Sequence, residues 1–74
     1  MLTIELRTEV TNTASSVLSR SPVRDLRRIR VDGKADHLKL SGKVRSYYHK
    51  QLAQETVRGV ARGMRLVNQI QVKS

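Results

Sequence analysis

The stretch Leu26–Val44, LRRIRVDGKADHLKLSGKV, decides the fold of this chain. Apolar and polar residues alternate on both sides of its Asp-Gly pair. Alternation of period two around such a pair is typical of a β-hairpin with one apolar and one polar face. The rest of the chain must supply a cover for the apolar face. That face is predicted to consist of Ile29, Val31, Leu38 and Leu40.

The position of the hairpin turn stays open at this point. Pairing can place the turn on Gly33-Lys34 or on Lys34-Ala35, and both registers keep the apolar residues on one face. Gly42 is predicted to break the second strand, because glycine weakens the interior of a strand.

Before the hairpin, residues 5–20 are predicted to form an amphipathic helix, because their apolar residues recur at helical spacing. Ser21-Pro22 should end this helix, since a proline disfavours helical geometry at the residue before it. The stripe that should face the core consists of Leu6, Val10, Thr13, Ala14, Val17 and Leu18.

After the hairpin, Ser46 is predicted to cap a second helix, Tyr47–Arg62, because its hydroxyl can accept an otherwise unpaired backbone N–H. Neighbouring side chains on a helix diverge by about 100°. Tyr48 is therefore predicted to face the core, and Tyr47 the solvent. Gly59 falls on the inner stripe, which indicates a close approach to the sheet or to the first helix.

The last segment, residues 66–72, is predicted to be a strand with Ile70 and Val72 inward. A strand–helix–strand connection gives a parallel pair, whereas the hairpin is antiparallel. The predicted fold is therefore an α+β two-layer sandwich of order αββαβ, with both helices on one face of a three-stranded mixed sheet. Residues 1–74 form one domain, with a core of about 5–72. The open face should display Arg28, Arg30, Lys39, Gln69 and Gln71, with Lys43 and Lys73.

The charge of the chain is strongly positive and unevenly distributed. The 15 Lys and Arg residues outnumber six Asp and Glu residues, for a formal net charge of +9. Residues 20–50 hold ten of the basic residues against three acidic ones, which gives +7. Such a field attracts nucleic acid, anionic phospholipid head groups or an acidic protein, and it also serves solubility.

Catalytic, cofactor and metal sites are not predicted. Catalysis needs converging groups, and the six acidic residues are scattered along the chain. His37 and His49 lie on different predicted elements, without further candidates that would complete a metal site. Cysteine is absent, and no glycine-rich loop suited to a phosphate is found. The chain is thus expected to be no enzyme and to take no small-molecule substrate.

The location follows from the first residues as written. Glu5 and Arg7 interrupt the initial apolar run, so no signal peptide is predicted and the expected location is cytoplasmic. If the chain is cut from a longer precursor, the periplasm or the cell envelope is expected instead.

Several segments together resemble one known family. They are the hairpin core IRV-DG-LKLSGKV, the helix SYYHKQLAQETVRGVARG and the ending MRLVNQIQV. From about Leu6 to Val72 the chain is similar to the BON domain (bacterial OsmY and nodulation) family. The resemblance implies two helices on a three-stranded mixed sheet, and a non-catalytic module that binds phospholipid membranes or partner proteins. Its most specific marks are Leu40-Ser41-Gly42-x-Val44, Gly63 before an apolar residue, and Val67-Asn68 before the last strand.

The leading functional hypothesis is binding of anionic phospholipid surfaces through a basic face. The sequence offers Pro22-Val23 and Leu26 as the one apolar tip for membrane insertion. The alternative is a protein–protein interaction or assembly module, in which the edge of the first or third strand pairs with a partner strand. A second alternative, weak non-specific nucleic-acid binding, is disfavoured because the sheet offers no aromatic residues for base stacking. The candidate anion-binding residues are Arg27, Arg28, Arg30, Lys39, Lys43 and Arg45.

Overall fold

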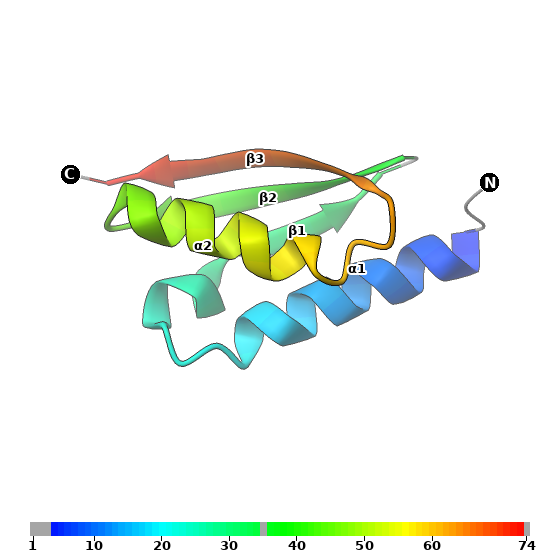
Figure 1. Cartoon of the computed structure of the whole chain (residues 1–74), viewed down its shortest axis with the longest axis horizontal. Coiled ribbons are helices and arrows are strands. Elements are labelled where there is room, and N and C mark those ends of the chain that lie inside the picture. Colours follow the sequence, from blue (N-terminus) through cyan, green and yellow to red (C-terminus); the bar gives the residue numbers. More distant parts are fainter. Residues whose placement is uncertain (1–3, 35, 74) are drawn as a thin grey trace.

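A computed structural model describes residues 4–34 and 36–73 of the chain. Two α-helices cover one face of a three-stranded sheet, and the other face is open (Figure 1). The predicted two-layer α+β fold and its αββαβ order are confirmed. In chain order the elements are α1 (Ile4–Ser19), the 3₁₀-helix η1 (Arg24–Arg28), β1 (Arg30–Gly33), β2 (His37–Val44), α2 (Tyr47–Arg58) and β3 (Arg65–Val72).

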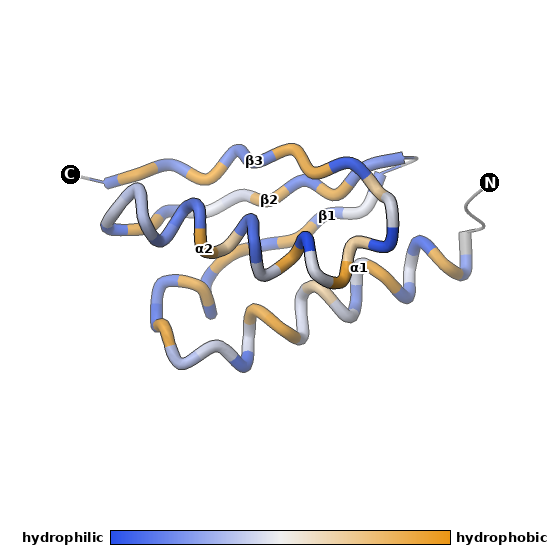
Figure 2. The backbone as a smooth tube through the Cα atoms, in the orientation of Figure 1, coloured by the Kyte–Doolittle hydropathy of each residue, from blue (hydrophilic) through white to orange (hydrophobic). Residues whose placement is uncertain are grey.

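The sheet has the order β1-β2-β3, with β2 in the centre. As predicted, β1 pairs with β2 in antiparallel orientation and β3 pairs with β2 in parallel. Leu38 and Leu40 of β2 are fully buried under the helices. Figure 2 shows apolar segments of the sheet and of both helices turned toward each other.

The hairpin register differs from both expected registers: the partner of Val31 lies two residues further along β2 than a Lys34-Ala35 turn requires, and four residues further than a Gly33-Lys34 turn requires. Val31 pairs with Leu40, and the backbone N–H of Lys34 donates to the His37 carbonyl at 2.8 Å. All these registers keep the apolar residues on one face, so alternation alone does not choose between them. The predicted turn at Gly33-Lys34 is therefore wrong. The pairing that a turn at Lys34-Ala35 requires is also wrong, and Ala35 itself lies outside the described residues.

Gly42 accommodates the observed register, because it lies against Ile29 and the Arg28 backbone. An ideal Cβ at this position would lie 3.3 Å from Cδ1 of Ile29 and 3.4 Å from the Arg28 carbonyl oxygen. Because Gly42 has no Cβ, there is space for the Ile29 side chain, which is buried in the core. With a φ of +134°, Gly42 adopts a conformation that other residues rarely take. The prediction that it breaks β2 is wrong, because β2 continues to Val44.

Helix α1 presents most of the predicted stripe to the core, but Val17 is only half-buried and lies outside the core cluster. Val10, Ala14 and Leu18 are buried at spacings of four residues, and Leu6 packs against them. Thr13 is exposed, so its predicted place in the stripe is wrong. The helix ends at Ser19, three residues before Pro22, as the proline rule predicts.

Helix α2 begins as predicted and ends four residues early. The Ser46 hydroxyl accepts the backbone N–H of His49 at 3.2 Å, which confirms the cap. Beyond Arg58 the chain leaves the helical path and buries Ala61 and Met64. Gly59 is exposed, and a Cβ there would meet only a carbonyl oxygen of its own helix at 3.6 Å. The predicted close approach at Gly59 is therefore wrong.

The connection between α1 and β1 holds an element that the sequence did not reveal. η1 places Leu26 in the core, where it is 1% exposed.

In the part of the chain that the structure describes, no helix is long and apolar enough to cross a membrane.

Candidate anion-binding site

Most acidic residues lie toward one end of the long axis of the domain, which measures 39 Å. Glu5 and Glu9 lie in the first half of α1, and Asp32 and Asp36 lie beside the hairpin turn. These segments are at the end of the molecule marked N in Figure 1. The opposite end holds η1, the start of α2 and the last residues of β2 and β3. Four of the six acidic residues thus lie toward one end of the domain.

Near the acidic end, basic side chains have acidic partners. Nη1 of Arg62 lies 3.8 Å from Oε1 of Glu9, and Nη1 of Arg65 lies 4.0 Å from Oδ2 of Asp36. These groups are well exposed, so each pair adds little stability. The pairs nevertheless reduce the positive field at this end.

At the opposite end, four basic side chains surround a surface hollow of about 290 Å³. We call Arg28, Lys43, Arg45 and Lys73 the cationic cluster. Arg28 comes from η1, Lys43 and Arg45 come from the end of β2 and just after it, and Lys73 follows β3. All four are exposed. Arg28, Lys43 and Lys73 make no ion pair with any carboxylate that the structure describes.

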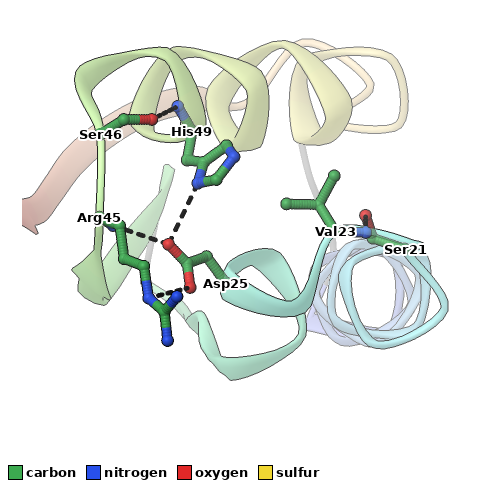
Figure 3. Close-up of polar contacts among 6 residues, drawn as sticks. All are labelled: Ser21, Val23, Asp25, Arg45, Ser46 and His49. Atoms are coloured by element: carbon green, nitrogen blue, oxygen red, sulfur yellow. Dashed lines mark hydrogen bonds and ion pairs between the residues drawn. The ribbon is translucent and has the colours of Figure 1, made fainter.

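Asp25 holds this end of the domain together (Figure 3). Its Oδ2 accepts the backbone N–H of Arg45 at 2.6 Å and Nδ1–H of His49 at 3.1 Å. Its Oδ1 lies 4.0 Å from Nε of Arg45. The hydrogen bond from the Arg45 backbone, followed by that from His49, lowers the pKa of Asp25 below its usual value. One carboxylate therefore ties η1 to the connection between β2 and α2.

Asp25 makes the stability of the domain sensitive to acid. Because its folded pKa lies below the unfolded value, its contribution is present above a pH of about 4 and is lost as pH falls through the folded pKa. Asp25→Asn should therefore flatten the acid limb of the unfolding free energy, measured by urea denaturation from neutral to acidic pH. The control is Glu5→Gln, on the exposed start of α1. Superimposable acid limbs for wild type and Asp25→Asn would contradict the assignment.

Both tyrosines are exposed beside the cationic cluster. Tyr47 is 63% exposed and Tyr48 is 67% exposed. The prediction that Tyr48 faces the core is wrong, because the inner stripe of α2 runs one residue later, through His49, Ala53 and Val57. His49 points toward Asp25, and its neighbour is consequently turned away.

The structure brings together three of the six predicted anion-binding residues and adds a fourth. Arg28, Lys43 and Arg45 line the hollow together with Lys73. The backbone N–H of Lys73 donates to the Val44 carbonyl at 2.7 Å, which holds the Lys73 backbone in place. The remaining predicted residues lie elsewhere: Arg30 opposite Ser41 and Lys39 opposite Asp32 in the sheet, and Arg27 exposed on η1 without lining the hollow.

The apolar tip predicted for membrane insertion is wrong. Leu26 is buried, and Val23 packs against the core, so of that segment only Pro22 is exposed. Among the described residues, the exposed large hydrophobic side chains are Tyr47, Tyr48 and Val72. Val72 was predicted to point inward, but it is 42% exposed at the end of β3. The apolar surface at this end therefore comes from the start of α2 and the end of β3.

The model of the BON domain family matches residues 7–74. The chain belongs to the BON domain family. This match confirms the resemblance noted in the sequence. The family consists of binding modules of a non-catalytic type, for lipids or proteins in general. A comparison with curated proteins found no match. Residues 4–34 and 36–73 contain no group of His, Asp and Glu that could hold a metal ion.

The free edge of β3 in this BON domain bears on the partner-strand alternative. Arg65 and Lys73 donate their N–H groups to carbonyls on the β2 side. Successive residues of a strand point their N–H groups to opposite sides. The N–H group of Ile70 therefore points to the free edge of β3. This N–H donates to Oδ1 of Asn68 at 3.1 Å, and Nδ2 of Asn68 donates to Oε1 of Gln54 at 3.0 Å. Asn68 thus occupies the donor that a partner strand would need.

Removing this amide should open the edge. Asn68→Val frees the N–H of Ile70 and leaves a β-branched edge, so it should self-associate more strongly than the wild type. One added hydrogen bond of about 1 kcal/mol corresponds to a roughly fivefold larger association constant. Sedimentation velocity over a range of concentrations measures the change. The control Gln71→Val adds the same side chain on the open face. If neither variant self-associates more strongly than the wild type, the Asn68 side chain does not prevent strand pairing at this edge.

Proposed function

We propose that this BON domain binds anionic phospholipid surfaces through the end that carries the cationic cluster. The observation that carries the proposal is the grouping at one end of both exposed tyrosines and of Arg28, Lys43 and Lys73, which pair with no carboxylate that the structure describes. Most acidic residues lie toward the opposite end. The resulting field would orient the domain with the cationic cluster toward a negative surface.

The expected attraction is sufficient for reversible binding. A basic residue close to an anionic leaflet contributes about 1 kcal/mol, so the four residues of the cationic cluster supply roughly 4 kcal/mol. Tyrosine side chains favour the head-group region, because an apolar ring and a polar hydroxyl suit its two environments. Tyr47 and Tyr48 would add this second contribution.

The predicted residues outside the hollow would act at longer range. Arg27 and Arg30 are exposed, and they increase the positive field without lining the hollow. Lys39 is half-buried and lies opposite Asp32 in the sheet, which reduces its contribution. The expected order of importance is therefore the cationic cluster first, then Arg27 and Arg30, and Lys39 last.

The two alternatives receive less support from the described residues. Strand addition at β3 meets the Asn68 side chain, and β1 offers a shorter edge, Arg30–Gly33. Nucleic-acid binding by stacking would need aromatic rings on the open sheet face, and both tyrosines lie on α2.

Vesicle flotation tests the proposal. The domain should float with vesicles of phosphatidylcholine and phosphatidylglycerol at low salt, less so at high salt, and remain unbound with phosphatidylcholine alone. Salt sensitivity is the signature of a surface-charge attraction. Equal flotation with neutral and anionic vesicles, or flotation with neither, would contradict the proposal.

A further inference from the structure

The hollow at the cationic cluster has a definite chemical preference. We propose that it binds a phosphate monoester group, supplied by a phosphorylated lipid head group or by a small phosphorylated molecule. The inference rests on the proposed function for its membrane source, and it names the chemical group that the surface recognises. The argument uses the size of the hollow, its charge, and the way in which its residues are held.

The size of the hollow suits one head group. Its volume of about 290 Å³ lies near the lower limit of protein ligand pockets, about 300 Å³. A phosphate with the first atoms of its ester fits such a space, whereas an acyl chain does not. Five of the six lining residues are charged, and Val44 is the sole apolar one.

The charge of the hollow favours a dianion. The cationic cluster supplies four positive charges, and Asp25 supplies one negative charge, which leaves +3. The Asp25 side chain is 13% exposed, and its carboxylate faces Arg45 and His49, so little of it meets a ligand. A phosphate monoester carries a charge of about −1.5 to −2 at neutral pH, whereas a diester carries only about −1. The monoester therefore gains more from the same four side chains.

The backbone under these side chains is held by contacts between distant segments. Asp25 fixes the N–H of Arg45, and the N–H of Lys73 donates to the Val44 carbonyl. The Arg28 carbonyl lies against Gly42 of β2, since an ideal Cβ there would be 3.4 Å from its oxygen. The basic groups consequently converge from three segments on one hollow. Such convergence distinguishes a site from charges that only solubilise a surface, because the latter do not need a common centre.

The surroundings of the hollow suit a membrane source. Arg45 immediately precedes the N-cap Ser46, and the two exposed tyrosines follow it in the first turn of α2. The start of a helix carries a partial positive charge, which adds to the attraction for an anion. With the tyrosines at the level of the head groups, the hollow would face the phosphate layer.

Two titrations test the proposal and identify the source. In ¹⁵N NMR spectra, inorganic phosphate should give saturable shifts at Arg28, Lys43–Arg45 and Lys73, whereas chloride at matched ionic strength should not. Vesicles with phosphatidic acid, which exposes a monoester, should bind more tightly than phosphatidylglycerol vesicles of matched surface charge. Phosphate shifts without the vesicle preference would support the site and indicate a small phosphorylated molecule. Absence of both would overturn the proposal.

Matched variants separate the site from general charge. Arg28→Gln with Lys43→Gln removes two contacts of the hollow and spares the Asp25 hydrogen bonds. It should weaken inorganic phosphate binding at least about tenfold, because hydrogen bonds from charged donors to a phosphate are stronger than neutral ones. The control, Arg30→Gln with Lys39→Gln, makes the same charge change on the sheet and should keep the phosphate shifts. Thermal melts verify that both variants fold, and Lys73→Gln after the last strand gives a second test.

The outcomes distinguish this inference from the proposed function. If the hollow and control variants lose phosphate binding equally while the wild type still floats with anionic vesicles, the site is wrong and the proposed function stands. If the wild type binds inorganic phosphate at the hollow but no anionic vesicle, the proposed function is wrong and the site stands.

Discussion

Leu40→Ala is expected to lower the free energy of unfolding by about 2–5 kcal/mol. Leu40 lies in the central strand, has no exposed surface, and packs in the core below both helices. Truncation removes its buried methyl groups and leaves a cavity that a sheet paired on both sides fills poorly. A domain of this length typically has about 0.05–0.15 kcal/mol of stability per residue, so the loss is a large part of the total.

Urea denaturation followed by circular dichroism measures this loss. The matched control is Val72→Ala, an aliphatic truncation at the end of β3, where 42% of the side chain is exposed. The control should cost less than about 1 kcal/mol, because a large part of the removed surface is already in water. Similar losses for the two variants would contradict the placement of Leu40 at the centre of the core.

Gly33→Ala is expected to destabilise the domain by about 1–3 kcal/mol through a clash with helix α1. An ideal Cβ at Gly33 would overlap the Oγ1 atom of Thr11. The Thr11 hydroxyl also donates to the Arg7 carbonyl at 2.9 Å, so a rotation that relieves the clash breaks this hydrogen bond. The close approach of β1 and α1 therefore requires glycine at this position.

A double-mutant cycle makes this explanation specific. Thr11→Ala removes the overlapping hydroxyl, so Gly33→Ala should cost about 1 kcal/mol less in that background than in the wild type. Denaturation of the four proteins at one temperature gives the coupling energy. Additive losses would mean that Gly33 is needed for its backbone rather than for its contact with Thr11.

The sequence was sufficient to predict which strands pair and which face of the hairpin is apolar, but not the register of the hairpin. Alternation of Ile29, Val31, Leu38 and Leu40 identified the inner face, because side chains of a strand point alternately to its two faces. The register depended on a tertiary contact, the packing of Ile29 against Gly42. No local pattern contains that contact.

The phase of helix α2 shows a similar limit. Tyr48 and His49 could each begin an inner stripe with residues four positions apart, and hydrophobicity favoured the tyrosine. The partner of His49 is Asp25, 24 residues away. This carboxylate also organises the hollow, and a separation of that size gives no periodic signal. Basic composition therefore identified Arg28, Lys43 and Arg45 as candidates, but it did not show that they share one hollow with Lys73.

The central claim is that the end with the cationic cluster faces the membrane. Paramagnetic relaxation enhancement in anionic nanodiscs with nitroxide-labelled head groups tests it most directly. The account predicts the strongest broadening at Lys43–Tyr48 and Lys73, and little at Glu5–Glu9 on the opposite end. Strongest broadening at Glu5–Glu9, or at Lys39 on the open sheet face, would contradict it.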